Sequence, residues 1–326
     1  MPKIFPPALA VLVSAALAAC GHDGATAPDA TPHTTLPAVD RVVVVSIDGL
    51  RGDALPWMPA LDALRARAAW TDSMQTVVPS LTVPGHLTMF TGRDVTKLGV
   101  TTNTLDQQAG YALTMNGAST MFQWVKGAGG RSAALIASSL VPAADLETAR
   151  AFLGIDQLTA VGTNLDELRT QALALATAPD APELLFVHVA TVDFAGHDFG
   201  WIRTDTTGAN GADVLGPQYV DAARAADGVV DAIRAALEPA IASGAVALIV
   251  TADHGGGHGE HCVANVVAAR EHCTSQPGDR TIPFFVLAKD VAPGRIVGAT
   301  SIMQVAPTVG ALLRLAVPSR AGAPVR

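Results

Sequence analysis

Short runs of β-branched or other apolar residues alternate along the chain with stretches of helical pattern. The apolar runs lie at residues 41–46, 132–137, 183–189, 245–251 and 281–287. Such alternation is typical of a parallel sheet whose two faces are covered by helices. The pattern therefore predicts an α/β fold with a central, mostly parallel sheet and helices on both faces.

Residues 219–241 show the clearest helical periodicity. Apolar side chains recur there at near-helical spacing, at Val220, Ala223, Val229, Val230, Ile233 and Leu237. Spacing of three and four residues places side chains on one face of a helix. We expect a long amphipathic helix that packs on the sheet.

The first 20 residues have the pattern of an export signal rather than of a structural helix. Lys3 precedes an apolar run at residues 8–19, and small residues lead into Cys20. Residues 17–20, Leu-Ala-Ala-Cys, resemble the lipobox of bacterial lipoproteins, in which the cysteine carries lipid. The resemblance implies an exported, periplasmic protein anchored to the membrane through Cys20; an ordinary cleaved signal peptide is the alternative.

Beyond the signal, the chain divides into a linker and one domain. Residues 21–38 mix Gly, Ala, Thr, Pro, Asp and His without periodicity, which predicts a flexible tether. The single folded domain is expected over residues 39–326. No later stretch is apolar enough to cross a bilayer, since a spanning helix needs about 20 such residues.

Composition narrows the class of partner. Hydrophobic residues make up 49% of the 326 residues and charged residues 15%, as in a globular protein. The formal net charge is −8, which argues against specific nucleic-acid binding because that depends on Lys and Arg contacts to phosphates. A small phosphorylated substrate, held by metal ions, remains compatible with this charge. The sequence does not indicate an oligomeric state.

Two cysteines, Cys262 and Cys273, lie close together in a loop-like stretch. In an oxidising periplasm such a pair favours a disulfide. A zinc site is the weaker interpretation, because neither cysteine belongs to a C-x-x-C pair.

Acidic residues follow three of the predicted strands. Asp48 comes after the first run, and Asp193 and Asp253 come after the runs at 183–189 and 245–251. In open α/β sheets ligands bind outside the carboxyl ends of the strands. Three carboxylates at this edge, two of them with a nearby histidine, predict a metal site.

Two segments concentrate metal-ligand chemistry. Asp193 and His197 are four residues apart, so one helical turn presents both to the same cation. Residues 253–261, Asp-His-Gly-Gly-Gly-His-Gly-Glu-His, place oxygen and nitrogen donors in a glycine-rich loop after a strand. The glycines cost backbone entropy unless a close approach is needed, so this loop is difficult to explain by structure alone.

A candidate nucleophile lies in the segment 79–92. Pro84 follows Thr82 closely, and the residues after it can form a helix, which places the threonine hydroxyl at a helix N-terminus. Free amides and the helix dipole favour an anion there, such as a phosphoryl group. A divalent cation is one recognised means of activating a hydroxyl, although a threonine at this place is also a common N-cap.

Asp-Gly after the first strand, Thr-x-Pro-x-His, Asp-x-x-x-His and Asp-His-Gly occur in this order in the chain. Together they resemble the alkaline phosphatase superfamily, and most closely its type I phosphodiesterase/nucleotide pyrophosphatase branch. The resemblance covers nearly the whole mature chain and implies an alkaline-phosphatase-like fold, two divalent metal ions expected to be Zn²⁺, and phosphate-ester hydrolysis through a covalent intermediate on Thr82.

The resemblance also implies roles for individual residues. One metal would be held by Asp193, His197 and His261, with His258 as the alternative third ligand. The other would be held by Asp48, Thr82, Asp253 and His254. Asn103 would bind a phosphoryl oxygen.

Some residues depart from the family pattern or favour one branch of it. Gly85 stands where many members have Asn, and Leu98-Gly99 stands where others have His-Gly. Residues 136–142 lack the Lys-x-Arg pair of one monoesterase branch, which favours a phosphodiesterase or pyrophosphatase over the alternative, a broad alkaline phosphatase. Thr82 and His86 disfavour a sulfatase. The alternative outside the enzymes is a lipoprotein that binds metal or phosphate without turnover.

Overall fold

A computed structural model describes residues 36–103, 115–258, 267–319 and 321–325. The strands are β1 (Arg41–Ile47), β2 (Ala69–Gln75), β3 (Ser132–Ala137), β4 (Gln157–Val161), β5 (Leu184–Val189), β6 (Val246–Thr251), β7 (Thr281–Leu287) and β8 (Gly294–Arg295). The α-helices are α1 (Pro59–Leu64), α2 (Thr82–Thr91), α3 (Val95–Leu98), α4 (Met121–Gly127), α5 (Leu146–Leu153), α6 (Leu165–Thr177), α7 (Thr191–Phe199), α8 (Pro217–Ser243), α9 (Pro277–Arg280) and α10 (Val305–Leu312).

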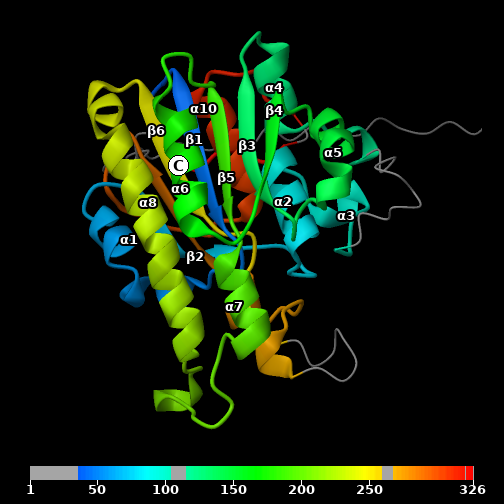
Figure 1. The fold of residues 1–326 in the computed structure, drawn as a ribbon, viewed down its shortest axis with the longest axis vertical. Helices are drawn as coiled ribbons and strands as arrows, with labels where there is room; N and C mark the ends of the chain where they lie inside the picture. Colours follow the sequence, from blue (N-terminus) through cyan, green and yellow to red (C-terminus); the bar gives the residue numbers. More distant parts are fainter. Residues whose placement is uncertain (1–35, 104–114, 259–266, 320, 326) are drawn as a thin grey trace, which may run out of the picture. The chain divides into compact units, whose positions relative to one another are not determined.

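The described residues form one eight-stranded sheet, in the order β4-β3-β5-β1-β6-β7-β2-β8. Strands β4, β3, β5, β1 and β6 are parallel, whereas β7 pairs antiparallel with both β6 and β2. Helices α6 and α8 lie on one face, and α10, α2 and α4 lie on the other (Figure 1). The predicted mostly parallel α/β sheet is therefore confirmed.

Burial explains which strands the sequence predicted. Every residue of β3, β5 and β6 is buried, and all of β1 except Arg41 is buried, so these strands read as continuous apolar runs. The three strands that sequence reasoning missed, β2, β4 and β8, are outer strands with exposed or half-buried residues. These segments form strands because they hydrogen-bond to neighbouring strands of the sheet, although their sequences are not continuous apolar runs.

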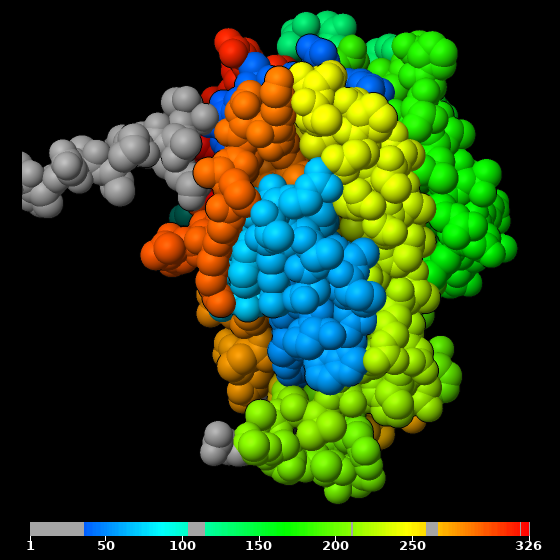
Figure 2. Space-filling model, turned by 90° about the vertical axis from the view of Figure 1, so that its left-hand side faces the viewer, coloured from blue at the N-terminus to red at the C-terminus, as the bar shows by residue number. Residues whose placement is uncertain are grey.

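The helix expected over 219–241 is α8, which runs two residues further at each end. Its buried face includes all six of the residues that predicted it, and it contacts β6, α6, α7 and α1. Figure 2 shows α1 (blue) packed against α8 (yellow-green). In the part of the chain that the structure describes, no helix is both long and apolar enough to cross a membrane.

The carboxyl ends of the central strands carry the residues of interest. Strand β5 leads through Ala190 into α7, which projects below the sheet in Figure 1. Strand β1 ends one residue before Asp48, and β6 ends two residues before Asp253. Because β1 lies between β5 and β6, the three strand ends are adjacent.

A buried carboxylate ties α1 to α8. Asp227 is 3% exposed, and its oxygens accept the backbone N–H groups of Ala60 at 2.7 Å and Leu61 at 2.9 Å. These are first-turn amides of α1, which have no partner within the helix.

Replacing Asp227 with alanine would leave two amides without their acceptor. We expect Asp227→Ala to lower the free energy of unfolding by about 1–3 kcal/mol in urea denaturation. Asp221→Ala is the matched control on α8, because Asp221 is exposed and pairs with Arg224 on the surface; it should stay within about 0.5 kcal/mol of the wild type. Equal effects of the two substitutions would contradict the capping role.

Candidate metal centre

Asp48 and the pair Asp253-His254 lie together beneath the strand ends. All three side chains are fully buried. His254 Nδ1–H donates to the Gly255 carbonyl at 2.7 Å, which leaves Nε2 as the free nitrogen. That Nε2 lies 3.2 Å from Asp48 Oδ1 and 3.3 Å from Asp253 Oδ2. The arrangement brings two carboxylate oxygens and one imidazole nitrogen to one point.

Thr82 reaches the same point from the start of α2. It is the first residue of α2, as the sequence predicted, and it is 3% exposed. Its hydroxyl oxygen lies 3.1 Å from His254 Nε2. The next amide of the helix, Val83 N–H, donates to Asn103 Oδ1 at 3.0 Å, so Asn103 also lies at this helix N-terminus.

Asp193 and His197 come from α7, where the predicted four-residue spacing brings Asp193 Oδ1 and His197 Nε2 to 3.6 Å. Asp193 Oδ1 is also 3.9 Å from His254 Nε2. His197 Nδ1–H donates to the Arg270 carbonyl at 2.8 Å. His197 therefore presents Nε2 to the carboxylate, as His254 does.

A further histidine, His272, joins this group. Its Nδ1–H donates to the Ser80 carbonyl at 2.6 Å, and its Nε2 lies 3.8 Å from Asp193 Oδ1. Its ring stacks on that of His254 at a centroid distance of 3.7 Å. Sequence reasoning missed His272 because it belongs to none of the four motifs; a histidine close to Cys273 in the stretch after the glycine-rich loop was the available signal.

Three carboxylate oxygens in the cluster, Asp48 Oδ1, Asp193 Oδ1 and Asp253 Oδ2, are buried with no hydrogen-bond partner among the described residues. Buried polar atoms are almost always hydrogen-bonded, so three exceptions at one place call for a cation. All three histidines with free Nε2 atoms have Nδ1 fixed by a backbone carbonyl, the usual support of a metal-binding imidazole. The residues therefore fit divalent metal ions.

Charge in the cluster perturbs its ionisation. Burial, and then the neighbouring charge of Asp48, raises the pKa of Asp193 well above its usual value. Burial opposes protonation of His254, but the carboxylates of Asp253 and Asp48 outweigh it and raise the pKa of His254 to about 10. Burial opposes the ionisation of Asp48, but the neighbouring His188 and His254 outweigh it and lower the pKa of Asp48 well below its usual value.

The two histidines expected to supply the third ligand have different outcomes. His258 faces Asp213 at 3.5 Å and Asp279 at 3.4 Å. Among the described residues, two groups of His and carboxylate ligand atoms lie close together, and His258 belongs to neither: they are Asp48, Asp253 and His254, and Asp193, His254 and His272. His261 lies outside the described residues, as do Cys20 and Cys262, so its role stays a prediction.

The glycines of the loop after β6 serve close packing. A side chain on Gly255 would meet the Gly278 carbonyl at 2.0 Å, and one on Gly256 would meet the Trp201 ring at 2.3 Å. Trp201 itself is fully buried and donates its Nε1–H to the Gly49 carbonyl. The glycines therefore allow the loop backbone to pack closely against other parts of the protein, namely Gly278 and Trp201.

Gly85, one of the departures from the family pattern, also has a structural reason. A side chain there would lie 2.8 Å from the Asp253 carbonyl oxygen. Helix α2 therefore packs directly on the backbone of a cluster residue, and this brings Thr82 and Asp253 to the same site.

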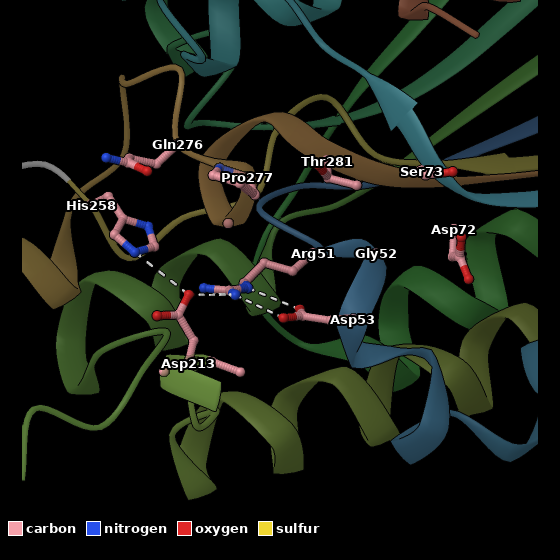
Figure 3. Close-up of a pocket in the computed structure, with 13 residues that line it drawn as sticks. Arg51, Gly52, Asp53, Asp72, Ser73, Asp213, His258, Gln276, Pro277 and Thr281 are labelled. Carbon is pink, nitrogen blue, oxygen red and sulfur yellow. Dashed lines mark hydrogen bonds and ion pairs between the residues drawn. The ribbon is translucent and has the colours of Figure 1, made fainter. Parts of the chain in front are cut away.

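A cavity of about 600 Å³ lies beside the cluster and contains none of its residues. Figure 3 shows Arg51 in this cavity between Asp53 and Asp213, with His258 beyond Asp213. Arg51 also donates to the Gly256 carbonyl at 2.9 Å. This network holds the glycine-rich loop through the Gly256 carbonyl.

Comparison with known proteins identifies the architecture. A family model described as type I phosphodiesterase/nucleotide pyrophosphatase matches residues 42–307. Murine ectonucleotide pyrophosphatase/phosphodiesterase 5 superposes with a TM-score of 0.65 and 16% identity, over 87% of this chain and 97% of that chain. An inactive variant of it in complex with AMP gives 0.64 and 14%, with the same shares. The lipoteichoic acid synthase LtaP from Listeria monocytogenes gives 0.60 and 15%, over 84% and 72%.

At these identities the solved structures show the fold alone, which is alkaline-phosphatase-like, as predicted. No curated protein matches the chain in sequence.

The ionisation of the cluster predicts that metal uptake releases protons. Ligands that carry protons below their raised pKa values must lose them to bind a cation, so affinity falls as the pH falls. Calorimetric titration of metal-free protein with zinc at about pH 7, in buffers of different ionisation enthalpy, should show release of at least about one proton per chain. Tight binding without proton release would contradict a protonated His254 in the free protein.

Proposed function

The chain belongs to the type I phosphodiesterase/nucleotide pyrophosphatase family, and we propose on that premise that it cleaves phosphate diesters through a covalent intermediate on Thr82. The family makes it a hydrolase of phosphoric esters. The observation that carries the finer proposal is the Thr82 hydroxyl, buried at a helix N-terminus 3.1 Å from His254 Nε2, in a cluster of unpaired carboxylate oxygens.

The cluster separates into two ligand sets. Asp48, Asp253, His254 and the Thr82 hydroxyl would hold one divalent ion. Asp193, His197 and His272 would hold the other, with His261 as the alternative third ligand. Nitrogen and oxygen donors in sets of three and four suit zinc, which is the metal we propose.

The metals, when bound, supply Lewis acidity that activates the hydroxyl and neutralises charge on the phosphoryl group. The Thr82 oxygen attacks phosphorus, a Thr82–phosphorus ester forms, and the bond to the leaving alcohol breaks. The Val83 N–H holds Asn103 Oδ1, so the Asn103 side-chain N–H and the Thr82 amide at the start of α2 would hold the phosphoryl oxygens. Water then attacks from the side the alcohol left, which breaks the ester and returns the Thr82 hydroxyl.

The segment after β3 supports a diester over a monoester. A monoester carries one more negative charge, which a cationic side chain would balance. Ser139 there hydrogen-bonds Asp48, Leu140 and Val141 are buried, and the described residues 138–142 include no Lys or Arg. One similar structure holds AMP, so we propose a nucleotide diester as the substrate class.

We further propose that the enzyme is exported and anchored through lipid on Cys20, which rests on the lipobox-like residues 17–20. A disulfide between Cys262 and Cys273 fits that compartment. Both proposals rest on the sequence. Zinc in this location would be acquired after export, since the ligands come from strand ends that meet only in the folded domain.

Hydrolysis assays test the nucleophile and the substrate class together. Zinc-loaded protein lacking residues 1–20 should hydrolyse bis-p-nitrophenyl phosphate faster than p-nitrophenyl phosphate. Thr82→Ala should lower kcat on the order of 10³-fold or more, whereas Thr82→Ser retains a hydroxyl and should keep much of the activity. Preference for the monoester would favour the alkaline phosphatase alternative. Zinc binding with no turnover of either substrate would favour a binding lipoprotein.

Asn103→Ala tests the phosphoryl-oxygen contact separately from metal binding. Loss of one donor to a developing oxyanion typically lowers the rate about 10²- to 10³-fold. We expect that decrease in kcat for the diester, with zinc content equal to the wild type by elemental analysis. An unchanged kcat would remove Asn103 from the catalytic machinery.

A further inference from the structure

We propose that His188 is a positioning residue that fixes the Asp48 carboxylate so that only Oδ1 faces the metal. The inference rests on the proposed function, because it assigns Asp48 to a metal site. His188 lies on β5, opposite Ser46 of β1, and belongs to none of the sequence motifs. Its side chain is fully buried, like that of Asp48.

Two hydrogen bonds determine which ring nitrogen of His188 carries the proton. The backbone N–H of Ala137 donates to His188 Nδ1 at 3.2 Å. A nitrogen that accepts a hydrogen bond is unprotonated, so the neutral ring has its proton on Nε2. That Nε2–H donates to Asp48 Oδ2 at 3.0 Å. The amide of Ala137 thus selects the tautomer that His188 needs to hold Asp48.

The end of the sheet supplies this amide. Pairing between β3 and β5 extends to Leu135 and Val187, and β3 continues to Ala137. The Ala137 amide therefore lies past the last paired residues of the two strands, and the His188 side chain accepts its hydrogen bond. A backbone group at the strand end thereby becomes part of the support of Asp48.

The two oxygens of Asp48 consequently differ. Oδ2 accepts from His188 and from the Ser139 hydroxyl at 3.3 Å. Oδ1 has no hydrogen-bond partner among the described residues and faces His254 Nε2 at 3.2 Å. Rotation of the carboxylate would give up both hydrogen bonds, so the pair holds Oδ1 toward the cluster. Hydrogen-bonded partners of metal ligands typically contribute 10- to 100-fold to metal affinity.

The experiment compares zinc binding by the wild type, His188→Leu and His188→Gln, measured by competition with a chelator. His188→Leu should weaken one zinc site about 10- to 100-fold and leave the other near its wild-type affinity, because the hydrogen bonds of the His188 side chain among the described residues go to Ala137 and Asp48 and not to Asp193. His188→Gln keeps an amide N–H that can reach Asp48 and should recover most of the lost affinity. In an Asp48→Ala background, His188→Leu should cause no further loss.

Phe186→Leu is the matched control. Phe186 is fully buried on the same strand, two residues away, and packs against the His86 ring. It should lower the Tm as a core substitution does while both zinc affinities stay at the wild-type values.

Three outcomes would overturn the inference. These are retention of both affinities by His188→Leu, equal weakening of both without recovery in His188→Gln, and addition of the full loss in the Asp48→Ala background. Each would show that His188 does not position Asp48. Absence of zinc binding by the wild type would instead contradict the proposed function, and this inference with it.

Discussion

The rest of this structure depends on like charges that are buried next to one another in one cluster. Asp48, Asp193 and Asp253 present one oxygen each to a buried cluster, and those three oxygens have no hydrogen-bond partner in the described part of the chain. In a low-dielectric interior such a group is stable only if protons or cations compensate it. This need for compensation raises the pKa values of Asp193 and His254, because protonation lowers the repulsion between the buried carboxylates.

The surrounding fold exists to hold these groups in contact. Gly49, directly after Asp48, has a φ of +72°, and a side chain there would meet Asp193 at 2.9 Å. Its carbonyl accepts from Trp201 and from the Tyr219 hydroxyl. The turn after β1 is therefore held by Trp201 and Tyr219, and the Gly49 N–H donates in turn to Asp253 Oδ1 of the cluster at 3.3 Å.

The side chains of the cluster are themselves held in place by hydrogen bonds with the surrounding backbone. His197, His254 and His272 are each oriented by a backbone carbonyl, and Asp48 is oriented by a histidine that a backbone amide holds in turn. A metal site built in this way depends on strand ends and loop backbones rather than on further charged side chains. The Arg51 network does carry charge, but it faces the adjacent cavity and stabilises the glycine-rich loop.

The sequence alone is enough to predict the central strands, the long helix and the acidic residues that follow strand ends. A buried strand is a local apolar run, and each acidic residue belongs to a local motif at the end of such a run. It did not predict β2, β4 or β8. Their residues are partly exposed, so these segments do not stand out as apolar runs, and their strand conformation depends on pairing with neighbouring strands. It also missed His272 and His188. It offered His258 as an alternative third ligand, and the structure places that side chain near Asp213 and Asp279. These features become visible in the folded protein, because the packing of distant segments, and not spacing along the chain, sets which imidazole nitrogen faces which carboxylate.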